Sequence, residues 1–146
     1  MDEQRRLFRH GFVILLVAFA LGGVAGAAGG GPHARLWLGA HTTGILVGLL
    51  VVAVGAVWPR LALGSRASRS LYAVTLGGNW TGVVVLGIFA PAVGFPSAIS
   101  TPELPPAAAW AATVVGLGLV VVTVSTFAMC GLVIAGLKAS PAKSAP

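Results

Sequence analysis

Acidic side chains are almost absent from this chain, and their scarcity excludes several kinds of activity. Only three of the 146 residues are Asp or Glu, and Asp2 and Glu3 lie at the amino end, so Glu103 is the one carboxylate side chain in the rest of the sequence. Hydrolysis by paired carboxylates needs two such groups around one bond, and proton-coupled transporters usually carry Asp or Glu within their spans. One isolated carboxylate provides neither arrangement.

Cysteine and the common nucleotide and nucleophile motifs are equally scarce. The single cysteine, Cys130, excludes an internal disulfide, a multi-cysteine metal cage and a C-x-x-C-H haem attachment. No serine or cysteine is set up with a base and an orienting acid. The glycine run at 29–31 lacks the lysine and the flanking strand of a phosphate-binding loop. The protein is therefore either an enzyme whose chemistry is supplied by a cofactor or a protein without catalytic activity.

What the chain does have is apolar sequence in long runs. Hydrophobic residues make up 57% of the chain and charged residues 8%, and the mean hydropathy is +0.96. Stretches at about 7–28, 36–58, 71–91 and 107–137 are each long enough to cross a bilayer. We therefore predict an all-α, integral membrane four-helix bundle over residues 1–138 and a disordered cytoplasmic tail over 139–146, with Pro91 and four further prolines keeping the third connection from being helical throughout.

The basic residues indicate topology rather than nucleic-acid binding, because the net charge of +6 comes from single residues scattered between apolar runs. Eight of the nine lie in the amino end, the loop after the second stretch and the carboxyl tail, and Arg35 alone lies on the other side. The positive-inside rule then places both termini in the cytoplasm of a bacterial-type inner (cell) membrane. The lipid bilayer is the expected partner, and nucleic acid is not.

Small residues recur four apart in three of the predicted helices. The pairs are Gly22 with Gly26, Gly44 with Gly48, and Gly78 with Gly82. Such pairs allow close approach of membrane helices, either within one bundle or between subunits. A bundle of four short helices has little interior, so a site for a bulky ligand would open between helices or be completed by a neighbouring protomer.

His41 is the main candidate for a ligand to a cofactor. It is expected about one turn inside the second helix, where its imidazole is either hydrogen-bonded to a neighbour or coordinates a metal. A lone nitrogen donor cannot build a zinc site, which needs three or four protein ligands. Haem iron can accept a single axial histidine, because the macrocycle itself supplies all the in-plane nitrogen donors.

Asn79 and Trp80 form a second candidate site near the middle of the third helix. The glycines around them would let a flat ligand lie against the backbone, but an interhelical hydrogen bond with Trp80 as packing is an equal alternative. His10, at the expected cytoplasmic mouth of the first helix, is either an interfacial residue or part of a propionate contact or proton path. His33 is expected in a solvated loop.

The sequence resembles the hydroxylaminobenzene mutases and, more distantly, the styrene oxide isomerases. The similarity covers nearly the whole chain and rests on the order and spacing of several short motifs, none specific alone. These are Arg9-His10-Gly11, Arg35-x-x-Leu38-x-Ala40-His41, Gly48, Trp58-Pro59-Arg60-Leu61 and Gly78-Asn79-Trp80.

The resemblance implies a rearrangement without net redox change. The mutases move the hydroxyl of an N-arylhydroxylamine to a ring carbon and give an ortho-aminophenol, and the isomerases open an aryl epoxide to an aldehyde with a b-type haem held by an axial histidine. For this chain it implies a small aromatic substrate, ferric haem b with His41 as iron ligand, and Arg35 and Gly44 beside the cofactor. Asn79 would orient the substrate, Trp80 would form a wall, and the protein would be a homo-oligomer, with a trimer as the first expectation.

Two departures favour the mutase reaction over epoxide isomerisation. Val47 stands where the isomerases carry an asparagine, and Val84 replaces the tyrosine of their third helix. The alternatives are a non-enzymatic haem-binding or electron-transfer protein and a cofactor-free membrane scaffold.

Overall fold

The computed structural model describes residues 2–94 and 109–138, and this part of the chain is helical without any strand. Its elements are α1 (Asp2–Ala27), α2 (Pro32–Val57), a 3-10 turn η1 (Trp58–Arg60), α3 (Ser65–Thr81), a π-helix η2 (Gly82–Phe89), the short α4 (Ala90–Ala92) and α5 (Ala109–Lys138). The predicted tail at 139–146, Glu103 and the prolines after Pro91 lie outside the described residues.

Within residues 2–94 and 109–138, four continuous helical segments are long and apolar enough to cross a membrane, which confirms the predicted fold class. α1, α2 with η1, and α5 provide three of them. The fourth runs through α3, η2 and α4 without a break, from Ser65 to Ala92. Backbone N–H and C=O groups are then paired within each segment, as hydrocarbon requires.

Three of the helices begin before the apolar stretches that predicted them. α1 begins at Asp2, α3 at Ser65 and α2 at Pro32, since charged or polar residues do not stop a helix and proline is suited to its first turn. His33 therefore lies in the first turn of α2, exposed, and not in a loop. His41 is nine residues beyond Pro32, about 14 Å along the helix, so its expected depth of one turn was wrong.

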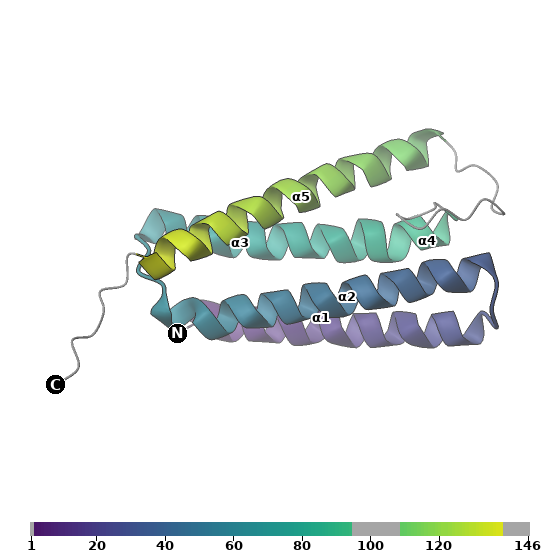
Figure 1. The fold of residues 1–146 in the computed structure, drawn as a ribbon, viewed down its shortest axis with the longest axis horizontal. Coiled ribbons are helices and arrows are strands. Elements are labelled where there is room, and N and C mark those ends of the chain that lie inside the picture. The colour runs from purple at the N-terminus through teal and green to yellow at the C-terminus, as the bar shows by residue number, and fades with distance from the viewer. Residues whose placement is uncertain (1, 95–108, 139–146) are drawn as a thin grey trace.

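The turn between α1 and α2 depends on glycine. Gly29, Gly30 and Gly31 have φ angles of +69°, +107° and +89°, in the region that side chains with a Cβ rarely adopt. This turn brings α2 back along α1, and Figure 1 shows the two helices side by side over their length.

α1 and α2 approach closely because glycines of α2 face side chains of α1. A Cβ added at Gly44 would lie 2.8 Å from the Cβ of Ala18, and one at Gly48 would lie 2.8 Å from Cγ of Leu15. The Gly44 and Gly48 pair therefore packs helices within one chain, one of the two roles predicted for such pairs.

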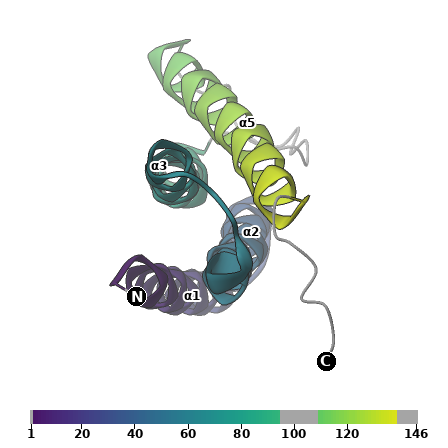
Figure 2. The ribbon, with the colours of Figure 1, turned by 90° about the vertical axis from the view of Figure 1, so that its left-hand side faces the viewer.

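The core lies where α3 and α5 meet this hairpin. Fully buried Leu7, Val51, Leu71 and Met129 come from α1, α2, α3 and α5 in turn. Gly78 of α3 packs against Ser125 of α5, and the Ala62 N–H donates to the Gly136 carbonyl at 3.1 Å. Figure 2 shows α5 crossing the other helices obliquely.

α5 is the least buried of the four segments. Only 11% of its most apolar 18-residue window is buried, compared with 39% for the segment Ser65–Ala92. Large side chains such as Leu117 and Phe127 are exposed, Phe127 by 76%. A long apolar face of the chain is thus left to lipid or to another protein surface.

Basic residues gather at one end of the bundle. The start of α1, the link between α2 and α3, the first turns of α3 and the end of α5 lie together in Figure 1. These segments carry Arg5, Arg6, Arg9, Arg60, Arg66, Arg69 and Lys138. Arg35 lies at the other end, in the first turns of α2.

Candidate functional site

His41 lies on the face of α2 that packs against α1. The side chain is half-buried, and its Nδ1 is 2.7 Å from the carbonyl oxygen of Ala18. The ring of Phe19 lies beside it, with centroids 6.1 Å apart and planes at 57°. The imidazole is thereby held at mid-helix by one polar and one aromatic contact.

This hydrogen bond determines which nitrogen of His41 can bind a metal. A carbonyl oxygen only accepts, so Nδ1 must carry the proton and donate it. In the neutral imidazole, Nε2 then keeps its lone pair. Metal-ligating histidines in proteins usually donate their other ring N–H in this way, because the bond orients the ring and fixes the tautomer.

A groove of about 530 Å³ lies between the ends of α1 and α2 on the Arg35 side of the molecule. We call it the glycine-lined groove, and its wall consists of Gly22, Ala25, Gly26, Gly30, Gly31, Ala34, Arg35 and Leu38. Gly22 belongs both to this groove and to the surroundings of His41, since a Cβ there would lie 2.7 Å from Nδ1. Arg35 therefore lines the groove that adjoins His41, whereas Gly44 lies against Ala18.

Asn79 is buried in α3, 8% exposed, and its Nδ2 donates to the carbonyl of Thr75 at 2.5 Å. That bond uses one of the two amide N–H groups. Thr75 is fully buried, and its Oγ1 has no hydrogen-bond partner among the described residues. The last two turns of α3 thus hold a small polar region within the apolar core.

Trp80 is paired with His10 of α1, a contact that sequence reasoning missed. Its Nε1–H donates to His10 Nδ1 at 3.3 Å, and the two rings meet edge to face at 6.2 Å and 85°. An indole N–H only donates, so His10 Nδ1 accepts and, in the neutral ring, Nε2 carries the proton. The partners are 70 residues apart, and no local pattern connects them.

The candidate residues fall into two levels of the bundle. His41 meets α1 at Ala18, and Trp80 meets α1 at His10, eight residues earlier or about 12 Å along the helix. The glycine-lined groove extends the first level toward Arg35. Asn79, Trp80 and His10 make the second.

The π-helix η2 begins directly after this second level. Its eight residues start at Gly82, and the amide of Ala90 donates to the carbonyl of Val85, five residues back. Such wide turns are rare and are often found at functional sites. Hydropathy gives no signal for them, because a π-turn and an α-turn bury the same kinds of side chain.

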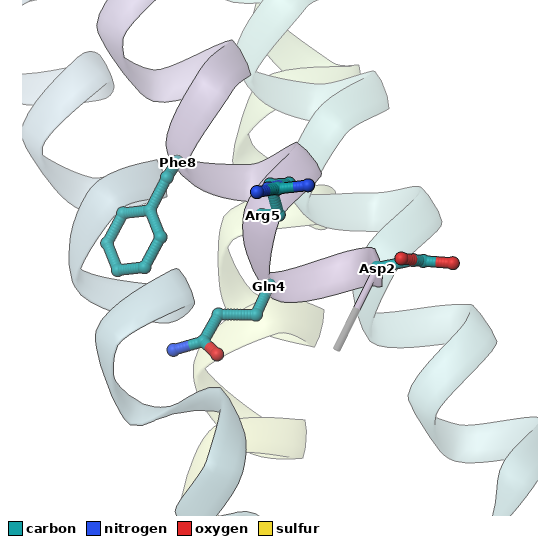
Figure 3. A pocket seen from close by; sticks show the side chains of 4 residues that line it. All are labelled: Asp2, Gln4, Arg5 and Phe8. Atoms are coloured by element: carbon teal, nitrogen blue, oxygen red, sulfur yellow. The ribbon is translucent and has the colours of Figure 1, made fainter.

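Other features of the described residues add no competing centre. Asp2, Gln4, Arg5 and Phe8, in the first turns of α1, line a hollow of about 440 Å³, and Figure 3 shows these four side chains. Within 2–94 and 109–138, no group of three His, Cys, Asp or Glu side chains is placed to hold a metal ion. Thr126 Oγ1 donates to the carbonyl of Val122, four residues before it, which is a structural role that threonine commonly has within a helix.

Fold and site together define a small multi-pass membrane protein whose chemistry-bearing groups are imidazole, amide and indole. The chain belongs to the styrene oxide isomerase family, whose model matches residues 3–138. It is also 26% identical to the hydroxylaminobenzene mutase HabB of Ectopseudomonas oleovorans over 149 residues, which cover 95% of this chain and 84% of that protein. No solved structure matches. The predicted relationship is confirmed, and it identifies a multi-pass protein of a membrane isomerase and mutase family.

Proposed function

We propose that this membrane isomerase rearranges an N-arylhydroxylamine to an ortho-aminophenol, or a closely related aryl substrate, with ferric haem b held by His41. The observation that carries the proposal is the hydrogen bond from His41 Nδ1 to the Ala18 carbonyl, which leaves Nε2 as a metal-binding lone pair. The name of the mutase relative supports the substrate class. Among the residues that the structure describes, no three His, Cys, Asp or Glu side chains are grouped to hold a bare metal ion, which favours a group that brings its own donors.

The residues around His41 fit such a group. The glycine-lined groove has the small side chains that a flat macrocycle needs beside a helix, and Arg35 lines it as a cationic partner for a propionate. When bound, haem supplies a Lewis-acidic iron that polarises the substrate oxygen. Gly44 contributes indirectly, because its contact with Ala18 supports the carbonyl that orients His41.

In the proposed reaction, the protein's own side chains orient the substrate and exclude water. In the rearrangement an N–O bond breaks, a C–O bond forms at the ortho carbon, and the ring proton lost there is balanced by one gained at nitrogen, so no oxidant is needed. Asn79 orients the substrate with the amide groups that its bond to Thr75 leaves available. Trp80 provides an aromatic wall, and the apolar surroundings exclude water that would trap a cationic aryl group.

A second copy of the chain is part of the proposal. His41 and Trp80 occupy different levels, and the apolar face of α5 is uncovered. We expect a homo-oligomer, a trimer in the first instance. The site would then lie between subunits, with helices of a neighbouring copy completing it. Sedimentation of the detergent-purified protein measures the mass, and a monomer that retains full activity would contradict this part.

Product analysis tests the function directly. Membranes containing the protein are incubated with phenylhydroxylamine and, separately, with styrene oxide, and the products are separated. We expect 2-aminophenol from the first substrate. In His41→Ala the rate should fall by more than the about 10- to 100-fold that loss of an outer-shell partner costs, because the ligand itself is removed. Equal conversion by His41→Ala, or conversion of neither substrate, would contradict the proposal.

A further inference from the structure

Gly22 has a neighbour that its position in a small-residue pair does not predict. Gly26, its partner in the pair, has nothing within 4 Å of an added Cβ, so this pair makes no close helix contact there. At Gly22 an added Cβ would lie 2.7 Å from Nδ1 and 2.9 Å from Cε1 of His41. The imidazole of His41 therefore occupies the space that a side chain at position 22 would fill.

The space beside Gly22 lies next to the carbonyl of Ala18, four residues earlier in α1. In an α-helix the carbonyl of residue 18 faces the amide of residue 22, and side chains tilt toward the amino end, so the side chain at 22 leans over that carbonyl. A carbonyl oxygen has two lone pairs. With glycine at 22, the second lone pair of Ala18 stays open to the side, and His41 Nδ1 reaches it at 2.7 Å.

Ala18 itself is held in place by the helix contact. It is 1% exposed, and its Cβ faces Gly44 of α2, where an added Cβ would lie 2.8 Å away. The carbonyl that accepts from His41 thus belongs to a residue buried in the α1–α2 contact, opposite Gly44, which is three residues from His41 along α2.

We propose that Gly22 is a positioning residue for His41: its missing side chain uncovers the Ala18 carbonyl, so that the imidazole is locked with the proton on Nδ1 and Nε2 available as a ligand. The inference rests on the proposed function only for what Nε2 binds. The locked tautomer is a property of the protein without cofactor.

Gly22→Ala and Gly23→Ala form a matched pair of tests. Both replace a helical glycine of α1 by alanine, but an added Cβ at Gly23 meets nothing within 4 Å. We expect haem affinity, measured by titration of purified protein, to fall about 10- to 100-fold in Gly22→Ala, the usual effect of losing the partner that orients a metal-ligating histidine. Gly23→Ala should bind as the unchanged protein does. Equal affinity in the two variants would overturn the inference.

Nitrogen NMR of the haem-free protein separates this inference from the proposed function. With ¹⁵N-labelled histidine and the His41 signal assigned by its loss in His41→Ala, we expect the Nδ1–H tautomer in the unchanged protein and a shift away from it in Gly22→Ala. That result with no haem binding at all would defeat the proposed function and leave the inference standing. Haem binding together with a His41 tautomer that Gly22→Ala leaves unchanged would overturn the inference and leave the proposed function standing.

Folding of the variant is controlled by a double substitution. If Gly22→Ala lowers the yield of folded protein, Gly22→Ala with His41→Ala should restore it, because the ring that collides with the new methyl group is gone. A failure to restore the yield would show that Gly22 serves packing unrelated to His41 and would overturn the inference.

Discussion

His10 and His41 are held in opposite tautomers by their neighbours. His41 donates through Nδ1 to a carbonyl, and His10 accepts at Nδ1 from the indole of Trp80. Only His41 therefore presents an unprotonated Nε2 in its neutral form. The sequence singles out His41 by its motif, but the distinction between the two rings follows from contacts with residues 23 and 70 positions away.

The buried hydroxyl of Thr75 leads to a prediction about the stability of the protein. Its Oγ1 is buried with no partner among the described residues, and an unpaired buried hydroxyl costs about 1–3 kcal/mol. Thr75→Val keeps the shape and removes the hydroxyl, so we expect it to raise the free energy of unfolding in detergent by about 1 kcal/mol. Thr126→Val, which removes an exposed hydroxyl bonded to its own helix, is the control and should change little. A loss of stability in Thr75→Val alone would mean that this hydroxyl binds a partner.

The helices themselves were the most predictable part of the molecule. Hydropathy identifies all four spans because the bilayer demands about 20 apolar residues from each. Their starting residues were missed, because Asp2, Pro32 and Ser65 begin helices outside the apolar runs. The π-turns from Gly82 and the pairing of Trp80 with His10 depend on backbone hydrogen bonding and on helix packing, which composition does not record.

The contact between α3 and α5 depends on the absence of a side chain at Gly78, which faces the Cβ of Ser125. We expect Gly78→Ala to lower the free energy of unfolding by about 1–3 kcal/mol, as overpacking does. Gly77→Ala changes the neighbouring glycine, where an added Cβ meets nothing within 4 Å, and should be neutral or stabilise by up to about 1 kcal/mol through helix propensity. Denaturant unfolding followed by circular dichroism measures both, and similar values would contradict the observed α3–α5 packing.

The π-helix predicts an unusual tolerance to deletion. A π-turn holds one residue more than an α-turn, so deleting the exposed Val84 should convert η2 to α-helix while the segments on either side keep their faces. Deleting Val120 from the regular helix α5 should instead rotate half of that helix by about 100° and disrupt its packing. We expect folded protein from the first deletion and little from the second, measured by size-exclusion chromatography. The opposite order would argue against a π-helix at η2.

For the whole molecule, charge and topology agree. The described basic residues other than Arg35 lie at one end of the bundle, the distribution that the positive-inside rule assigns to the cytoplasmic side. Reporter enzymes that are active only outside the cytoplasm should therefore be inactive when fused after Lys138 and active when inserted at Gly30, in the turn beside Arg35. Activity after Lys138 would reverse the proposed orientation.

The proposed function depends on one imidazole, His41, that is oriented within the bundle by the Ala18 carbonyl. The absorption spectrum of the detergent-purified protein after addition of haem tests this most directly. We predict a Soret band at a stoichiometry of about one haem per His41, as expected for a single axial histidine, and its loss in His41→Ala but not in His33→Ala. A protein that takes up no haem, or a His41→Ala variant that keeps the same spectrum, would contradict the assignment of His41 as the ligand.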